Sequence, residues 1–169
     1  MGLSATFYAV SALTFQTLTA DPSSFHPKQA EQWITFDQNQ EGVEHVLDKC
    51  MANPSLKAHL LFSPEALLQP KPEAGASIEE HYLEAVPYHP PERVTLWEEV
   101  LQNVSNECMV SAYDPEDMNQ NGVYPETWHN DESPHLAFNR SHVVTAIEQL
   151  KVFIAEAHAE EHYILVFVG

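Results

Sequence analysis

The chain has 169 residues, of which 44% are hydrophobic and 19% charged, with 25 acidic against 7 basic residues and a formal net charge of −18. This length fits one domain with a single core, and the apolar fraction excludes a disordered chain. The negative charge excludes nucleic acid and anionic membranes as partners, because like charges repel over about 8 to 10 Å at physiological salt, and it favours a basic protein partner.

The cysteines and the absence of targeting signals predict a cytoplasmic protein. Cys50 and Cys108 lie far apart, with no metal-site spacing, and their apolar, helix-like surroundings predict reduced and buried thiols. No apolar run reaches the roughly 18 residues that span a membrane. The N-terminal stretch, whose first basic residue is Lys28, does not have the pattern of a secretory signal.

The first half of the chain predicts a strand and then helices. Residues 3–10 are rich in β-favouring types, and Ser11 stands where an N-cap would begin a helix to about Leu18. A second helix, ending at Asn53-Pro54, is predicted by apolar residues at i, i+3, i+4, i+7 and i+8, namely Val43, Val46, Leu47, Cys50 and Met51. Several prolines between Pro64 and Ala76 predict a short helix and then an exposed, flexible loop near 69–77.

The second half predicts two strands and two longer helices. Residues 81–89 are expected to form a strand at a sheet edge, because Pro87 cannot donate a ladder hydrogen bond. Pro90-Pro91 begins a helix whose apolar face holds Val94, Trp97, Leu101 and Val104, and the apolar pattern continues to Asp114-Pro115. A loop is predicted over 114–134, and the longest helix over about 143–157.

The last strand determines the predicted fold. Residues 163–168 form an unbroken apolar run, which indicates a strand buried on both faces and paired with the N-terminal strand. The chain is therefore predicted to be a single α+β domain, mostly helical around a small mixed sheet that includes the N- and C-terminal strands.

Several segments resemble one bacterial family. They are Tyr88-His-Pro-Pro-Glu-Arg-Val94 with the helix after it, Tyr113-Asp114-Pro115-Glu116 with Met118, Val123-Tyr124-Pro125 with Trp128, and the final helix and strand. Together they are similar to the YfbM-like family, a domain of unknown function, across 88–169 and more loosely across 1–50. The resemblance implies one YfbM-like domain over 1–169, an α+β fold, a cytoplasmic bacterial setting and no assigned catalytic residues. Some small acidic families of this kind are immunity proteins encoded beside secreted toxins.

Two metal-binding patterns occur in incomplete form. His158-Ala159-Glu160-Glu161-His162 has the letters of the inverted zinc-protease motif, but it stands at a helix end with too few residues after it for a third ligand. Residues 117–122 repeat the first half of a calcium-binding EF-hand loop, but position 12 is Trp128 where a bidentate glutamate is needed. Neither metal is therefore expected, and no cofactor is predicted. No phosphate-binding glycine motif is found either.

An acidic segment is the candidate binding surface. Between Arg93 and Arg140 there are nine acidic residues and no lysine or arginine, and six of the nine lie within 114–132, called here the acidic segment. The residues predicted to contact a partner are Asp114, Glu116, Asp117, Tyr124, Glu126, Trp128, Asp131 and Glu132. Acidic residues around aromatic anchors are typical of a surface that binds a basic protein. The alternative is that the aromatic residues belong to the core and the acids are merely solvated.

These observations favour a non-enzymatic binding protein that neutralises a basic protein partner, most concretely a bacterial toxin immunity protein. A small metal-binding protein or hydrolase that uses histidine and carboxylate groups is the alternative, as is a housekeeping protein of unknown role.

Overall fold

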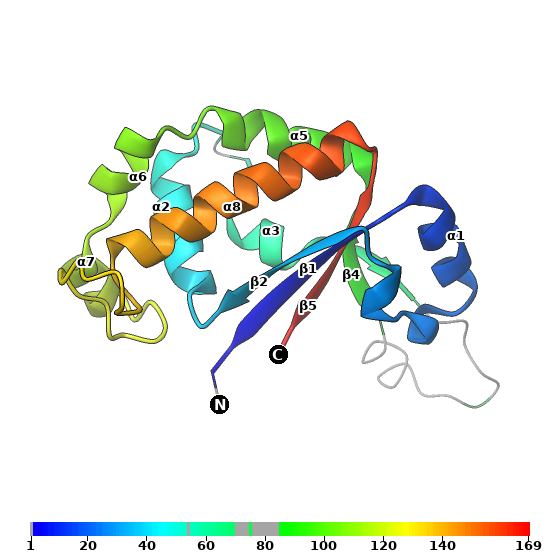
Figure 1. The fold of residues 1–169 in the computed structure, drawn as a ribbon, viewed down its shortest axis with the longest axis horizontal. Helices are drawn as coiled ribbons and strands as arrows, with labels where there is room; N and C mark the ends of the chain where they lie inside the picture. Colours follow the sequence, from blue (N-terminus) through cyan, green and yellow to red (C-terminus); the bar gives the residue numbers. More distant parts are fainter. Residues whose placement is uncertain (1, 54, 70–74, 76–84) are drawn as a thin grey trace.

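The computed structural model describes residues 2–53, 55–69, 75 and 85–169 (Figure 1). Its elements in chain order are β1 (Ser4–Val10), α1 (Ala12–Ala20), η1 (Pro22–Ser24), η2 (Pro27–Gln29), β2 (Gln32–Asp37), α2 (Gln40–Cys50), α3 (His59–Phe62), β3 (Ala66–Leu68), β4 (Val86–His89), α5 (Pro91–Gln102), α6 (Asn106–Ala112), α7 (Pro115–Gln120), α8 (Arg140–Ala159) and β5 (Tyr163–Val168). The predicted α+β class is confirmed. Among the described residues, no helix combines the length and apolar character that crossing a membrane requires.

The sheet joins the two ends of the chain. Its strands run in the order β2-β1-β5-β4-β3, and β1 pairs with β5 so that Phe7 lies opposite Val166. Ser4 and Gly169 also exchange two backbone hydrogen bonds of 2.9 Å. The predicted pairing of the terminal strands is therefore confirmed. Every described pairing is antiparallel, where a mixed sheet was expected.

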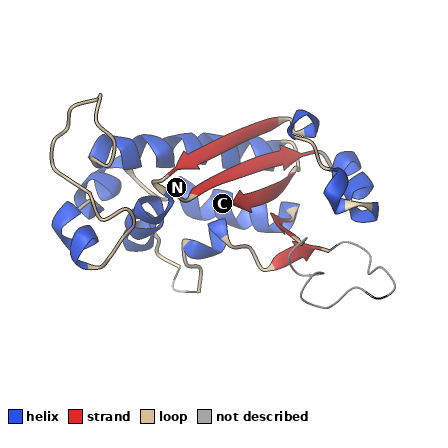
Figure 2. Cartoon of the chain, turned by 90° about the horizontal axis from the view of Figure 1, so that it is seen from below, coloured by secondary structure: helices blue, strands red, loops and turns tan. Residues whose placement is uncertain are grey.

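One face of the sheet carries the main core. Along β1 the alternate residues Ala5, Phe7 and Ala9 are buried, because successive strand residues point to opposite faces. The ring of Phe7 packs against Phe36 and Phe62, with centroids 5.2 Å away in each case. Seen from below, the strands lie in front of the α8 layer, so the helices cover the opposite side of the sheet (Figure 2).

The other face of the sheet is covered at one end by α1. Ser11 caps this helix, as predicted, by accepting a hydrogen bond from the Thr14 N–H at 3.1 Å. Phe15 and Leu18 pack with Leu165 in a second apolar cluster. This cluster explains the unbroken apolar run of β5, since it buries the face of β5 that the main core does not. Burial ends there, and Phe167 and Val168 are 37% and 48% exposed.

Two predictions around β4 are wrong. β4 is an inner strand, because β3 lies outside it. Pro87 is tolerated there since β5 pairs with β4 only at Tyr88 and His89. The short helix expected after Pro64 is instead the strand β3, and the loop expected near 69–77 lies largely outside the described residues.

The helices follow the predicted apolar faces, with one break. α2 and α8 form as expected from their spacing, with Val43, Val46 and Leu47 fully buried in α2. The apolar pattern after Pro91 is divided into α5 and α6, because Ser105 caps a new helix by accepting a hydrogen bond from the Cys108 N–H at 3.1 Å. The predicted loop over 114–134 begins with the helix α7.

Candidate interaction site

The acidic segment begins with a capped helix. Asp114 is the N-cap of α7, and its Oδ1 accepts hydrogen bonds from the N–H groups of Glu116 and Asp117, both at 3.1 Å. Pro115 occupies the first helical position, where its missing N–H costs nothing. Asp114 is therefore used in part to stabilise α7, although its side chain is exposed.

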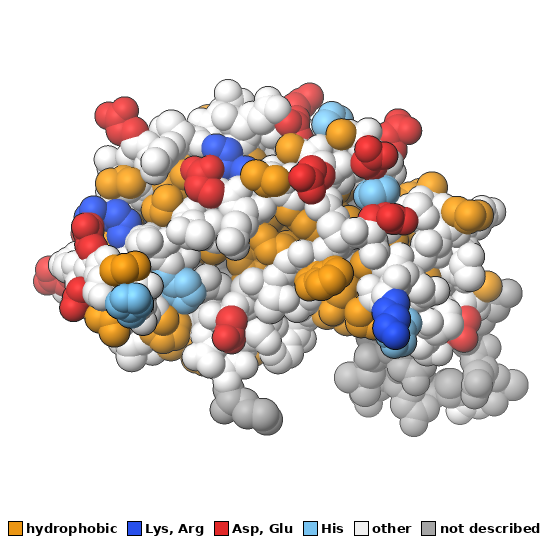
Figure 3. Space-filling view, in the orientation of Figure 1, with side chains coloured by type: hydrophobic (Ala, Val, Ile, Leu, Met, Phe, Trp, Pro, Cys, Tyr) orange, Lys and Arg blue, Asp and Glu red, His pale blue; other side chains and the backbone are white. Residues whose placement is uncertain are grey.

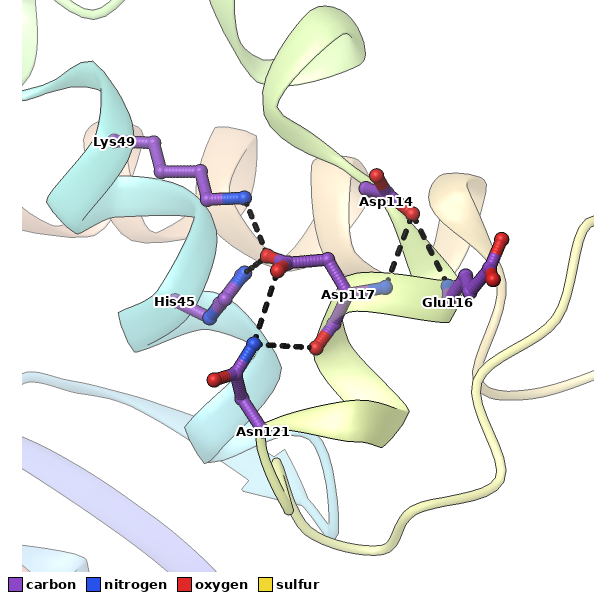
Figure 4. Close-up of polar contacts among 6 residues, drawn as sticks. All are labelled: His45, Lys49, Asp114, Glu116, Asp117 and Asn121. Carbon is purple, nitrogen blue, oxygen red and sulfur yellow. Dashed lines mark hydrogen bonds and ion pairs between the residues drawn. The ribbon is translucent and has the colours of Figure 1, made fainter.

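Asp117 ties α7 to α2 (Figure 4). Its Oδ2 accepts hydrogen bonds from Lys49 Nζ at 2.8 Å and lies 3.1 Å from His45 Nε2, while Asn121 Nδ2 donates to its Oδ1 at 2.9 Å. The Lys49 ammonium, followed by His45, holds the pKa of Asp117 below its usual value. Asp117 is thus already paired within the protein, and its charge is largely compensated.

The residues that match the first half of an EF-hand loop, 117–122, lie mostly in the helix α7 and do not form a loop around an ion. Asp117 and Asn121 point toward α2, whereas the Asn119 side chain forms hydrogen bonds with the backbone of Trp128. The Asn119 side chain accepts a hydrogen bond from the Trp128 N–H at 3.0 Å and donates one to the Trp128 carbonyl at 2.8 Å. These oxygens serve internal contacts, and within the described residues no three His, Cys, Asp or Glu side chains are grouped as a metal site.

Trp128 is a core residue, which corrects its prediction as an exposed anchor. It is 3% exposed, and its Nε1–H donates to the Val123 carbonyl at 2.9 Å. Tyr113 is also buried, and its hydroxyl donates to the His129 carbonyl at 2.8 Å. Burial raises the pKa of the Tyr113 phenol to about 12. Of the aromatic residues in this segment, only Tyr124 is half-buried, and its N–H donates to Glu41 Oε2 at 2.8 Å.

The remaining acids differ in whether they are paired. Glu132 forms an ion pair with Arg140 at 2.6 Å. Glu116, Glu126 and Asp131 are exposed, and no ion pair to them occurs within the described residues. These three carboxylates are the part of the acidic segment that is open to a partner.

The structure adds one carboxylate that the sequence did not indicate. Glu41, on the first turn of α2, accepts the hydrogen bond from the Tyr124 N–H and so lies against the acidic segment. Glu44 and Asp48 are directed elsewhere, because the Asp48 Oδ1 accepts a hydrogen bond from the Ala58 N–H at 2.8 Å and His59 lies near Glu44. Burial raises the pKa of Glu44, and the negative charges of Glu41 and Asp48 contribute to the increase. We call Glu41 together with Glu116, Glu126 and Asp131 the acidic end. No local pattern marked Glu41, because only the tertiary contact between α2 and Tyr124 brings it to the acidic segment.

The residues that match the inverted zinc-protease motif, 158–162, do not lie on one helix. α8 ends at Ala159, Glu161 has a positive φ of 54°, and His162 precedes β5. His158, on the last turn, has its Nδ1 3.1 Å from the Thr95 hydroxyl. The two histidines therefore do not have the one-turn spacing on a helix that the motif requires.

The two cysteines come together although they are distant in sequence. Cys50 ends α2 and Cys108 lies in α6, which packs on α2. Both thiols are free and half-buried, where full burial was expected. Burial and the neighbouring Cys108 thiol raise the pKa of Cys50 to about 12, so Cys50 is a thiol rather than a nucleophilic thiolate at neutral pH.

Comparison with known proteins gives a family and a fold but no activity. A family model described as "Domain of unknown function (DUF1877)" matches residues 1–167. Among solved structures, a protein of unknown function, YfbM from Escherichia coli, is similar over 98% of this chain and 99% of its own, with a TM-score of 0.64 and 11% sequence identity. At that identity the likeness shows a common fold alone. No curated protein matches.

Proposed function

Because this chain belongs to the DUF1877 family, whose description assigns no activity, we propose a function from its own surface. It is a non-enzymatic binding protein whose acidic end contacts a basic protein partner, most concretely as an immunity protein that neutralises a toxin. The observation that carries this proposal is the set of exposed, unpaired carboxylates at Glu116, Glu126 and Asp131.

The charge balance around the acidic end supports a basic partner. Lys49 and Arg140 are the basic side chains paired with the acidic segment, and both already neutralise a carboxylate, at Asp117 and Glu132. The carboxylates of Glu116, Glu126 and Asp131 have no ion-pair partner within the described residues. A basic protein would compensate their charge, and the field would steer its approach.

The same geometry limits how the partner is held. Trp128 and Tyr113 are committed to the core, so aromatic anchors of the usual kind do not supply affinity at the acidic end. Exposed carboxylates at the rim of an interface act mainly on the association rate. The acidic end is therefore proposed to accelerate encounter with the partner and to select a positively charged one. Contacts elsewhere on the surface keep the dissociation rate low.

Charge reversal tests this proposal. The partner is sought first among products of the genes that flank the one encoding this chain, since an immunity gene lies beside its toxin gene. We expect the combined change Glu116→Lys, Glu126→Lys and Asp131→Lys to lower the association rate about tenfold at low ionic strength, with little change in dissociation. Co-expression of this chain should also restore growth of cells that make the toxin.

A matched variant controls for net charge. The changes Glu99→Lys, Glu107→Lys and Glu148→Lys alter three exposed carboxylates outside the acidic end by the same total charge. If both triple variants slow association equally, net charge alone is responsible and the acidic end is rejected as the site. If no flanking gene product binds this chain or is neutralised by it, the immunity role is rejected.

A further inference from the structure

A continuous groove runs between β2 and α8, on the face shown in Figure 3. It consists of three hollows with volumes of about 570, 430 and 360 Å³. The first two share Gln32 and Glu156, and the second and third share Thr35 and Gln149. Because neighbouring hollows share residues of both elements, they follow the length of β2 as one groove.

The edge of β2 is open for pairing. β1 and β2 are antiparallel, and the Gln38 N–H donates a hydrogen bond to the Leu3 carbonyl in the same register. In an antiparallel pair every second residue forms hydrogen bonds with the partner strand, so the bonded residues of β2 can be counted back from Gln38 in steps of two. Ile34 and Phe36 therefore turn their backbone groups toward β1. The N–H and C=O groups of Trp33, Thr35 and Asp37 point outward, and β2 has no partner on that side in the described sheet, whose order begins with β2.

The charged side chains of the groove are acidic. Its lining includes the carboxylates of Glu31, Asp37, Glu156 and Glu160, and no lysine or arginine lines any of the three hollows. In Figure 3, acidic side chains gather toward the C-terminal end of α8, above a band of hydrophobic side chains. A segment that enters this groove must therefore supply positive charge to compensate the carboxylates.

Exposed apolar side chains provide the anchor that the acidic end lacks. Trp33 is 64% exposed and Val152 is 57% exposed, and both line the middle hollow. The other two tryptophans, Trp97 and Trp128, are only 0% and 3% exposed. Large exposed aromatic residues are enriched among the residues that dominate binding energy.

We propose that this groove binds an extended, basic segment of a partner protein, which adds a strand to the free edge of β2. The inference rests on the proposed function for the basic character of the partner and names the surface that holds it. In an added strand, alternate side chains point toward α8, where basic ones meet Glu156 and Glu160, and toward the opposite face, where apolar ones pack beside Trp33. A second copy of this chain fits poorly, because edge-to-edge pairing would place Glu31 and Asp37 of two copies together.

The groove is also continuous with the acidic segment. The third hollow is lined by Asp37 at the end of β2 and by Pro134 and Leu136, which follow Asp131 and Glu132. A partner attracted to Asp131 can therefore reach the edge of β2 without leaving the surface of this face.

The test uses a defined probe, a peptide of about eight residues that alternates lysine and valine, added to the full chain. We expect a blue shift of the Trp33 emission, because Trp33 is the one highly exposed tryptophan of the three. Hydrogen exchange should slow at the amides of Trp33, Thr35 and Asp37, with little change at Ile34 and Phe36, whose amides are already bonded to β1. The same peptide with alternate backbone nitrogens methylated should bind at least about tenfold more weakly.

A matched pair of variants isolates the backbone contact. Thr35→Pro removes an outward N–H without removing a hydrogen bond to β1. Edge strands tolerate a proline at such a position. Thr35→Val loses the same hydroxyl contact to Thr6 but keeps the N–H. Circular dichroism should show that both variants fold. Only Thr35→Pro is expected to lose peptide binding, by about tenfold.

Four outcomes would overturn the inference. They are equal binding of a glutamate-valine peptide, equal binding by both Thr35 variants, protection of α2 and α7 in place of β2, and a dimer that protects β2 without any peptide. The first of these speaks against the charge of the segment. The third leaves the acidic end as the binding surface and so separates failure of this inference from failure of the proposed function.

Discussion

Gly42 of α2 lies directly against the indole ring of Trp128: a Cβ built on Gly42 would be 2.3 Å from Trp128 Cη2. The ring occupies the space that a side chain on α2 would need, and this contact joins the acidic segment to the helix layer. The absence of a side chain at Gly42 is therefore a requirement of packing.

Gly42→Ala is expected to destabilise the protein. Overpacking of a buried aromatic ring costs about 1 to 3 kcal/mol, and the better helix propensity of alanine returns about 1 kcal/mol. Trp128→Ala should cost more, about 3 to 5 kcal/mol, because it leaves a large cavity. Urea denaturation measures both. If the free energy of unfolding of Trp128→Ala equals that of the wild type, Trp128 does not belong to the core.

Val166→Asp tests the central position of β5. Val166 is 1% exposed, so the substitution places a carboxylate in the apolar core and should cost several kcal/mol, about 3 or more. Val168→Asp is the matched control, because the same chemical change occurs two residues along the strand at a side chain that is 48% exposed. Similar melting temperatures for the two variants would contradict the burial of β5.

His89 should make stability fall in mild acid. Its ring is 1% exposed and its Nε2 lies 2.8 Å from the Leu61 carbonyl, and burial lowers its pKa from 6.5 to about 4. The unfolded chain then binds a proton more readily than the folded one, so this stabilisation is complete above about pH 6.5 and decreases as the pH falls toward 4. The loss corresponds to about 3 kcal/mol.

The measurement compares the free energy of unfolding of wild type and His89→Gln between pH 7 and pH 4. Other groups titrate in both proteins, so the difference between the two curves isolates His89. We expect the wild type to lose more stability than the variant over this interval. Parallel curves would show that His89 is protonated in the folded protein or accessible to water.

Asp117→Asn tests the link between α7 and α2. The folded pKa of Asp117 is depressed by Lys49 and then by His45, so its stabilising contribution is present above the unfolded pKa of about 4 and is lost as the pH falls through the folded value. At pH 7 the variant should unfold at a lower urea concentration than the wild type. At a pH below the folded pKa of Asp117 the two midpoints should converge, because both side chains are then uncharged. A constant difference at all pH values would indicate a role other than charge.

Much of the fold could be derived from local patterns. The spacing of Val43, Val46 and Leu47 determines which face of α2 is buried, because a helix brings these residues to one side whatever it packs against. In the same way, the apolar run of β5 and the Ser11 cap indicate their structures through nearest neighbours in sequence. Such features depend on residues a few positions apart, and a single sequence contains them.

The candidate sites depend on contacts between distant residues, which no local pattern records. Trp128 and Glu132 are both in the acidic segment, but only tertiary packing places the first in the core against Gly42 and the second in an ion pair with Arg140. The order of the sheet likewise leaves β2 at an open edge with Trp33 exposed, although nothing in residues 32–37 distinguishes an edge strand from an inner one. The sequence by itself determined the sign of the charge and the faces of the elements. The tertiary structure decided which carboxylates remain free, because pairing and burial depend on which elements pack together.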